Sequence, residues 1–341
     1  KRNGVRASLL PLLINYFKDR QMRVKWRGHL SEVRKLPGGG AMGATLGIWE
    51  FLSQTNDNAD CIPAEDRFKF VDDLTILEII NLLNISIQSY DVLSHVPSDI
   101  STNNQFIDKS QLKSQKYLED INEWSEKQKM IISKPKTKAM IINYTNNYQF
   151  NTRLKLSGHN IEIVDEMKIL GTIINNSLTW DENCSHLIKK VNKRMALIRN
   201  AKAFGATTKE RVHLWIVFCR NNLEQSCVLW HSSLIQENIE DLERTQKTFA
   251  KLVLGQKYQN YEDALIKLNL LPLSQRRHGL CLKFAQSGIK NETLTDLLKR
   301  NDKGHTMETR NFETHKVEWS NTARYGKSSI PYMQGLLNET K

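Results

Sequence analysis

The chain has 341 residues, 40% of them hydrophobic, which is enough for one large hydrophobic core or two smaller ones. Its formal net charge of +12 favours an acidic partner such as a nucleic acid. No apolar run approaches the roughly 18 residues of a membrane helix. The five cysteines form no CxxC pair and no metal-ligand pattern, so we expect reduced, mostly buried thiols. The sequence opens without an initiator methionine or secretion signal, so we expect a piece of a longer, unsecreted protein of the nucleus or cytoplasm.

The N-terminal part predicts a helix followed by a basic ribbon. Residues 5–18 carry apolar side chains all round a helix. Residues 22–28 and 30–36 alternate and predict two paired strands, with Arg20, Arg23 and Arg27 on or beside them.

The glycine-rich stretch 36–47 contains Gly38, Gly40 and Gly43 at GxGxxG spacing. A dinucleotide fold would need a buried strand before these glycines and an acidic residue about 20 residues later, and neither is present. A P-loop is excluded because Ala44-Thr45 stands where Lys-Ser/Thr is required. The stretch favours either close approach of a phosphate or base pair at the start of a helix, or a plain flexible turn.

Two adjacent carboxylates, Asp72 and Asp73, lie between two apolar runs in FKFVDDLTIL, residues 68–77. The runs predict a strand and its return, so the acids fall at a tight turn. A hard cation such as Mg²⁺ suits carboxylates, and two such ions can clamp the oxygens of a phosphoryl transfer. The alternative is a solvated turn. We expect the pair to protrude into a trough bordered by positive side chains.

The rest of the chain predicts mixed structure and then helices. We expect helices at 76–89 and 110–129, a loop at 95–109, and strands at 138–144, 154–164 and 168–174. From about 181 to 290 the pattern is almost wholly helical, with Trp180, Trp215 and Trp230 in the core. The net charge is +8 for residues 1–40, −7 for 41–182, +6 for 183–254 and +5 for 255–341. Basic segments therefore flank the acidic pair in sequence, as a phosphate polymer requires, although lysine and arginine also cover solvated helix faces.

Five motifs resemble the reverse transcriptases of non-LTR (LINE-type) retrotransposons. FVDD at 70–73 is similar to their aromatic-x-Asp-Asp motif, and GAMGATLG at 40–47 to their G-x-PQGS-x-LG element. Residues 129–140 and 167–180 resemble the segment containing N-x-x-K-T and the Leu-Gly hairpin that supports the primer end. Residues 229–255 resemble thumb helices, in which an I-E-x-x-Q-K core recurs. The resemblance implies an α+β fold: a partial polymerase palm at 1–180, with an antiparallel sheet packed on helices, an all-helical thumb and connection at 181–290, and a polar, weakly ordered tail at 291–341.

The resemblance also implies roles for individual residues. Asp72 and Asp73 would hold two Mg²⁺ ions, and Lys136 would contact the dNTP phosphates and protonate pyrophosphate, unless it is a solvated surface amine. The DNA primer and RNA template would meet residues in three groups: Gly40, Met42, Gly43 and Ala44 along template and nucleotide; Leu170 and Gly171 under the primer end; and Arg20, Lys189, Lys190, Lys193 and Arg194 on the duplex backbone.

Two departures from the family pattern predict weak or absent polymerase activity. The family's third metal carboxylate precedes the glycine element, yet the only acids before position 57 are Asp19, Glu32 and Glu50, none in an apolar strand. Met42 replaces the usual Gln. The first alternative is a non-catalytic nucleic-acid-binding remnant. The second is a nucleotide-cofactor enzyme, which would need an open parallel sheet.

Overall fold

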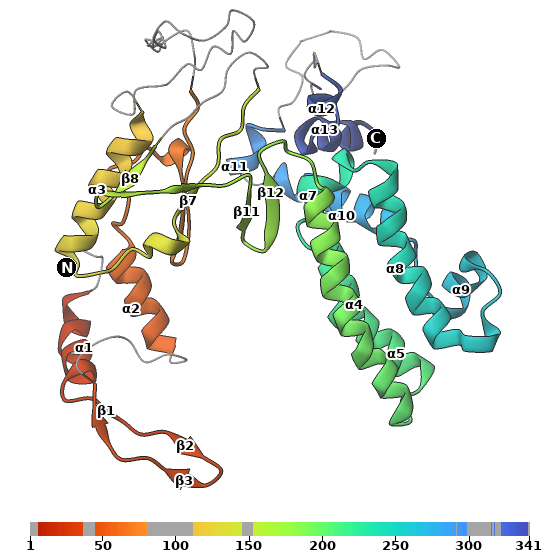
Figure 1. The fold of residues 1–341 in the computed structure, drawn as a ribbon, viewed down its shortest axis with the longest axis horizontal. Coiled ribbons are helices and arrows are strands. Elements are labelled where there is room, and N and C mark those ends of the chain that lie inside the picture. Colours follow the sequence, from red (N-terminus) through yellow and green to blue (C-terminus); the bar gives the residue numbers. More distant parts are fainter. Residues whose placement is uncertain are drawn as a thin grey trace, which may run out of the picture. The chain divides into compact units, whose positions relative to one another are not determined.

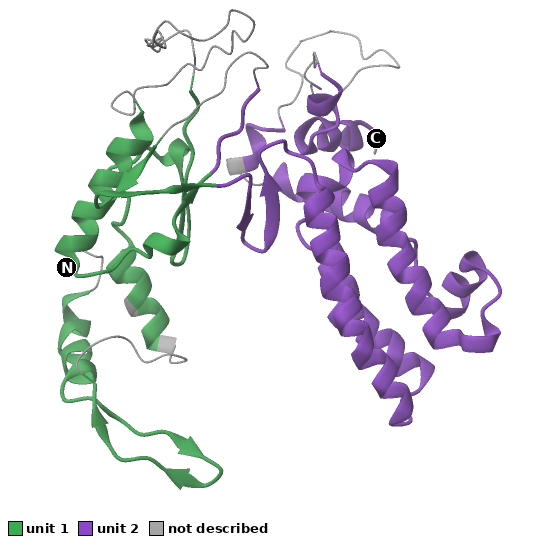
Figure 2. Cartoon of the chain, in the orientation of Figure 1, with its two compact units in different colours: residues 1–139, 145–163 green, residues 140–144, 164–341 purple. Residues whose placement is uncertain are grey.

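The computed structural model describes residues 6–36, 45–80, 112–144, 153–290, 292–298, 315, 317 and 322–339. These form two compact units, which Figure 2 colours separately. Unit 1 comprises residues 1–139 and 145–163, and unit 2 comprises 140–144 and 164–341. Among the described helices, none is both long enough and apolar enough to cross a membrane.

Unit 1 begins with the predicted helix and ribbon (Figure 1). A 3-10 turn at Ala7–Leu9 leads into α1 (Leu10–Phe17). Strand β1 (Gln21–Met22) pairs antiparallel with β4 (Arg34–Lys35), and β2 (Lys25–Trp26) with β3 (His29–Leu30). The tip has positive φ at Arg27 and Gly28. The predicted ribbon is confirmed.

The centre of unit 1 is a β-hairpin packed against helices. Its elements are α2 (Thr45–Thr55), a 3-10 turn (Ala64–Asp66), β5 (Arg67–Phe70), β6 (Asp73–Ile76) and α3 (Lys113–Lys127). Leu74 and Ile76 alternate along β6 and pack on a core that includes Tyr117 and Ile121 of α3. This alternation continues the strand through Ile76, so the predicted start of a helix there is wrong. Residues 77–80 have no regular structure, and 81–89 lie outside the described residues.

Glu78 lies in the irregular segment after β6 and binds the first residues of α3. Its two carboxylate oxygens accept hydrogen bonds from the backbone N–H groups of Lys113 and Ser114, both at 2.9 Å. The first N–H groups of a helix have no partner within the helix, and a negative charge is favoured at this end. Glu78 therefore caps α3 from 35 residues earlier in the sequence.

The remaining strands of unit 1 are shorter than predicted. Strand β7 (Lys138–Ala139) has two residues and pairs in parallel with β10 (Glu162–Ile163), while 140–144 are irregular. Strands β8 (Lys155–Leu156) and β9 (His159–Asn160) form a hairpin. Over the described part of the chain the strands make six separate two-stranded ladders, of which five are antiparallel. The fold is α+β, as predicted, but one continuous antiparallel sheet is not found among the described residues.

Unit 2 is one further hairpin and a set of helices (Figure 1). The hairpin is β11 (Glu166–Ile169) with β12 (Thr172–Asn175). The helices are α4 (Asp181–Ala203), α5 (Thr208–Leu214), a π-helical stretch (Trp215–Arg220), α6 (Asn221–Glu224), α7 (Cys227–Trp230), α8 (Gln236–Leu254), α9 (Tyr261–Leu268), α10 (Leu273–Gly288), α11 (Glu292–Thr295), α12 (Ala323–Gly326) and α13 (Ser329–Glu339). The helical prediction for 181–290 is confirmed.

The core of unit 2 lies among α4, the π-helical stretch, α8 and α10. Trp215 stacks on Phe249 with ring centroids 4.5 Å apart, and Trp215 and Trp230 are fully buried. Four of the five free cysteines are buried, and Cys61 of unit 1 is exposed. Near the C-terminus, Met333 and Leu337 of α13 pack with Ala285 of α10. The end of the expected weakly ordered tail is therefore a packed helix.

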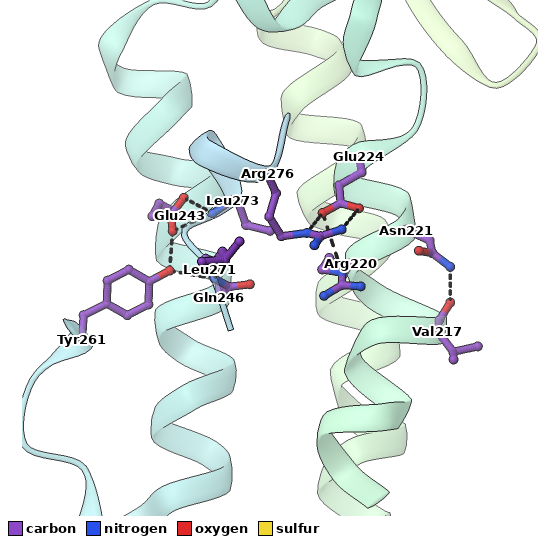
Figure 3. A network of polar contacts seen from close by, with 10 residues as sticks. All are labelled: Val217, Arg220, Asn221, Glu224, Glu243, Gln246, Tyr261, Leu271, Leu273 and Arg276. Atoms are coloured by element: carbon purple, nitrogen blue, oxygen red, sulfur yellow. Dashed lines mark hydrogen bonds and ion pairs between the residues drawn. The ribbon is translucent and has the colours of Figure 1, made fainter. Parts of the chain in front are cut away.

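A polar network joins α8, α9 and α10 (Figure 3). The Glu243 carboxylate accepts from the backbone N–H of Leu273 at 3.1 Å and from the Tyr261 hydroxyl. Gln246, one turn later, donates to the Tyr261 oxygen and to the carbonyl of Leu271, both at 2.9 Å. Glu243 and Gln246 are the Glu and Gln of the E-x-x-Q pattern, and their spacing places both on one face of α8. The pattern here fixes where α9 and α10 begin.

Candidate nucleic-acid interface

Helix α4 carries a basic face that follows the two acids of its first turn, Asp181 and Glu182. Residues 183–209 contain seven lysines and arginines and no aspartate or glutamate. Leu187, Val191, Met195 and Ile198 are buried at helical spacing. The cations therefore lie away from the core: Lys189 and Lys193 are exposed, and Lys190 and Arg194 are half-buried. Such a face suits a phosphate backbone.

Strand β11 adds Lys168 to this face. Its Nζ lies 3.3 Å from Nε2 of His186, and His186 precedes Lys190 by four residues and Lys193 by seven, so the three share one side of α4. The pKa of His186 is lowered below its ordinary 6.5. Burial is the largest cause, followed by the charges of Lys168 and of the lysines of α4. Burial, Arg194 and Lys168 likewise lower the pKa of Lys190. The structure thus gathers more positive charge than α4 provides alone.

Lys168 and His186 were not predicted from the sequence as site residues. The helical spacing of His186 with Lys190 and Lys193 was a usable signal. Lys168 had no such signal in the sequence, because its position beside α4 follows from how the β11–β12 hairpin packs on that helix. Arg194 has a second role: its Nη1 donates to the carbonyl of Phe218 at 2.7 Å and ties α4 to the π-helical stretch.

The β11–β12 hairpin is fixed to the helices at both ends. The backbone N–H of Ile173 donates to Oδ1 of Asn183 at 3.1 Å, and Asn175 donates to Glu182 at 2.7 Å. Leu170 and Gly171 form its tight turn, both with positive φ, and Gln225 donates to the carbonyl of Leu170 at 3.4 Å. The predicted hairpin at these residues is confirmed, and the Leu170 side chain is 53% exposed. Contact with a primer stays a prediction.

The acidic pair lies at the tip of the β5–β6 hairpin, as predicted. Val71 has φ of 57°, Asp72 follows it in the turn, and Asp73 pairs with Phe70. Both carboxylates are exposed, and Phe68 and Phe70 beside them are 57% and 60% exposed. A trough around the pair stays a prediction. A hollow of about 540 Å³ among the described residues of unit 1 is bordered by α3 and the β8–β9 hairpin and does not include either aspartate.

The base of this hairpin is held firmly. Lys69 donates to the carbonyls of Thr55, Asn56 and Asn58 at 2.6, 2.9 and 3.1 Å, and so satisfies the C-terminal end of α2. Burial lowers the pKa of the Lys69 ammonium. Arg67 pairs with Asp60 at 2.9 Å. The hairpin that carries the acidic tip is therefore tied to the C-terminal end of α2.

Metal binding at the tip would depend on two carboxylates. No group of three or more His, Cys, Asp or Glu side chains able to hold a metal occurs in the described part of the chain. Two adjacent carboxylates and water suit one Mg²⁺ ion, which retains several waters in most protein sites. A site for two ions needs further oxygen ligands.

The other predicted site residues are scattered. Lys136 is exposed in a 3-10 turn (Lys134–Lys136) of unit 1. Arg20 also belongs to unit 1, where its guanidinium lies 5.1 Å from the ring centroid of Tyr16. Gly40, Met42, Gly43 and Ala44 lie outside the described residues.

Comparison with known proteins gives no relative for this chain. No family model, no curated protein and no solved structure matches it. Functional assignment therefore depends on the chemistry of the residues described above.

Proposed function

We propose that this chain is the palm–thumb part of a non-LTR retrotransposon reverse transcriptase, and that it binds a primer–template duplex through α4. The observation that carries the proposal is the basic face of α4, which lacks any acidic residue over 183–209 and is extended by Lys168 from β11. Strand β12 of the β11–β12 hairpin is joined to the same helix. A positive surface of this kind binds phosphates without reading base sequence.

In the proposed reaction, Asp72 and Asp73 hold Mg²⁺ where a primer 3′-hydroxyl attacks a dNTP. The metal would activate the hydroxyl and stabilise the departing pyrophosphate, and Lys136 would donate the proton to it. The exposed tip of β5–β6 supports access by a large substrate. Because two carboxylates give fewer ligands than two Mg²⁺ ions require, we expect this chain alone to bind duplex but to polymerise weakly or not at all.

A non-catalytic nucleic-acid-binding remnant is the second candidate. It is favoured by the solvent exposure of both aspartates and by the lack of a third ligand nearby among the described residues. The cofactor-binding alternative is not supported, because the single parallel ladder of the described strands has two residues on each side.

Primer extension tests the catalytic part of the proposal. Wild type and the Asp72→Asn/Asp73→Asn variant would be compared on an RNA template with a DNA primer, dNTPs and Mg²⁺. A Glu65→Gln/Glu123→Gln variant removes two exposed charges elsewhere in unit 1 and serves as the matched control. Incorporation lost only in the aspartate variant supports the enzyme. No incorporation by wild type, with duplex binding intact, supports the remnant.

Duplex binding tests the part that both candidates share. We expect Lys189→Gln/Lys193→Gln to weaken binding about tenfold and to reduce the slope of log affinity against log salt by about 1 to 2. Lys283→Gln, at an exposed position of α10, is the control and should change neither. Equal affinity and equal salt slope in all three proteins would refute the role of α4.

A further inference from the structure

Lys168 and His186 come from different elements and meet at one point of the basic face. Lys168 Nζ donates to His186 Nε2 across 3.3 Å, which requires this nitrogen of the imidazole to be unprotonated. A neutral histidine in contact with a lysine ammonium is the arrangement expected when no anion is bound.

The pair is held in place by the framework around it. Ile173 is the cross-strand partner of Lys168, and its backbone N–H donates to Asn183, three residues before His186. The strand and the helix are therefore joined next to the Lys168–His186 contact. A site whose groups are already positioned loses little entropy when a ligand binds.

The charges around His186 are mostly positive. Lys168 faces it from β11, and Lys189, Lys190 and Lys193 surround it on α4. The acids nearest to the pair in sequence are Glu182, which accepts a hydrogen bond from Asn175, Asp181, which accepts one from Asn238, and the exposed Glu166, two residues before Lys168. Burial and all four lysines oppose the protonation of His186.

We propose that Lys168 and His186 form a clamp for one backbone phosphate of the bound nucleic acid, and that His186 takes up a proton from solvent as the phosphate arrives. This inference rests on the proposed function, because it assigns residues and a proton to the same basic face. A phosphate oxygen between the two side chains accepts one hydrogen bond from each, once the imidazole carries both protons. The phosphate charge also offsets the lysines that keep His186 neutral in the free protein.

The clamp makes duplex affinity depend on pH with a definite sign. The pKa of His186 is lower in the free protein and higher in the complex. At a pH between these two values, the complex holds one more proton than the free protein and free duplex together. Affinity therefore rises as pH falls through this interval and is level outside it. Each pH unit of the interval corresponds to about a tenfold change in Kd.

Fluorescence anisotropy with a labelled RNA–DNA duplex tests the clamp at constant ionic strength, between about pH 8 and about pH 5.5. Wild type would be compared with Lys168→Gln, His186→Gln and His213→Gln. His213 is an exposed histidine of α5 in the same unit and provides the matched control. Circular dichroism at each pH would establish that all variants are folded.

We expect Kd to fall about tenfold over this pH range in wild type and in His213→Gln. The dependence should be flat in His186→Gln. Lys168→Gln should bind more weakly at every pH. A His186→Gln protein with the pH dependence of wild type would overturn the clamp while leaving the proposed function intact. A wild-type protein that binds no duplex at any pH would overturn both.

Discussion

Glu224 neutralises two arginines inside unit 2, so removing its charge should destabilise that unit. Its side chain is 9% exposed; Oε1 lies 2.5 Å from Nε of Arg276 and 3.7 Å from Nε of Arg220, and Oε2 lies 3.1 Å from Nη2 of Arg276 (Figure 3). The carboxylate raises the pKa of Arg276, whereas burial and Arg276 lower the pKa of Arg220. Both guanidinium groups thus depend on one carboxylate.

The expected cost of Glu224→Gln is about 2–3 kcal/mol of unfolding free energy. Leaving a buried charge without its partner costs roughly 3–5 kcal/mol, and we take the lower part because the Arg276 side chain is 26% exposed to water. The glutamine oxygen still accepts one neutral hydrogen bond, which offsets about 1 kcal/mol. Arg220→Met in the Glu224→Gln background should recover part of the loss, because one of the two uncompensated charges is then removed.

Urea unfolding with hydrogen–deuterium exchange of α10 peptides measures this cost in unit 2 alone. Glu237→Gln, an exposed position in the first turn of α8, is the control and should cost no more than about 1 kcal/mol. The reasoning is refuted if Glu224→Gln costs no more than Glu237→Gln, or if Arg220→Met in its background recovers nothing.

Three further substitutions test other contacts. Gly171→Ala should destabilise the β11–β12 hairpin by about 1–2 kcal/mol, because φ is +88° and a Cβ would lie 2.5 Å from Nε2 of Gln225. Amide hydrogen exchange of the hairpin measures this loss. Gly205→Ala, at φ of +83° in open space, is the control and should cost less. Burial, Arg277 and His278 lower the pKa of His231 to about 4 from 6.5. The unfolded chain therefore binds more protons between pH 6.5 and about pH 4, and the free energy of unfolding should fall as pH drops through this range. His231→Gln should abolish this pH dependence in urea titrations, and an unchanged dependence would contradict the assignment. Glu78→Gln should lower protection of α3 by about 1 kcal/mol, since it weakens the cap on Lys113 and Ser114; equal exchange rates would show that the cap is not needed.

Local patterns predicted the elements well where one periodicity dominated. The two apolar runs of residues 68–77 placed Asp72 and Asp73 in a hairpin turn, and the helical pattern from about 181 placed Lys189 and Lys193 on a helix. The prediction failed at the end of β6, where the apolar run was also compatible with the start of a helix.

Contacts between distant residues could not be predicted from local patterns. Glu78 caps a helix that begins 35 residues later, and Lys168 meets His186 across a hairpin whose opposite strand is bound by Asn183. The parallel pairing of β7 with β10 joins residues 24 positions apart in sequence, through two-residue strands too short to have a detectable period. Each of these depends on tertiary structure, for which a single sequence has no local signal.

The shared acceptor Glu243 limits how the segment between α8 and α10 can change length. Tyr261 and the first residue of α10, Leu273, bind the same carboxylate, so the eleven residues between them form a segment closed at both ends. An insertion or deletion there would pull one of the two donors away, whereas replacement of the exposed Ile266 would leave both in place. During divergence this stretch is therefore expected to accumulate substitutions while keeping its residue count.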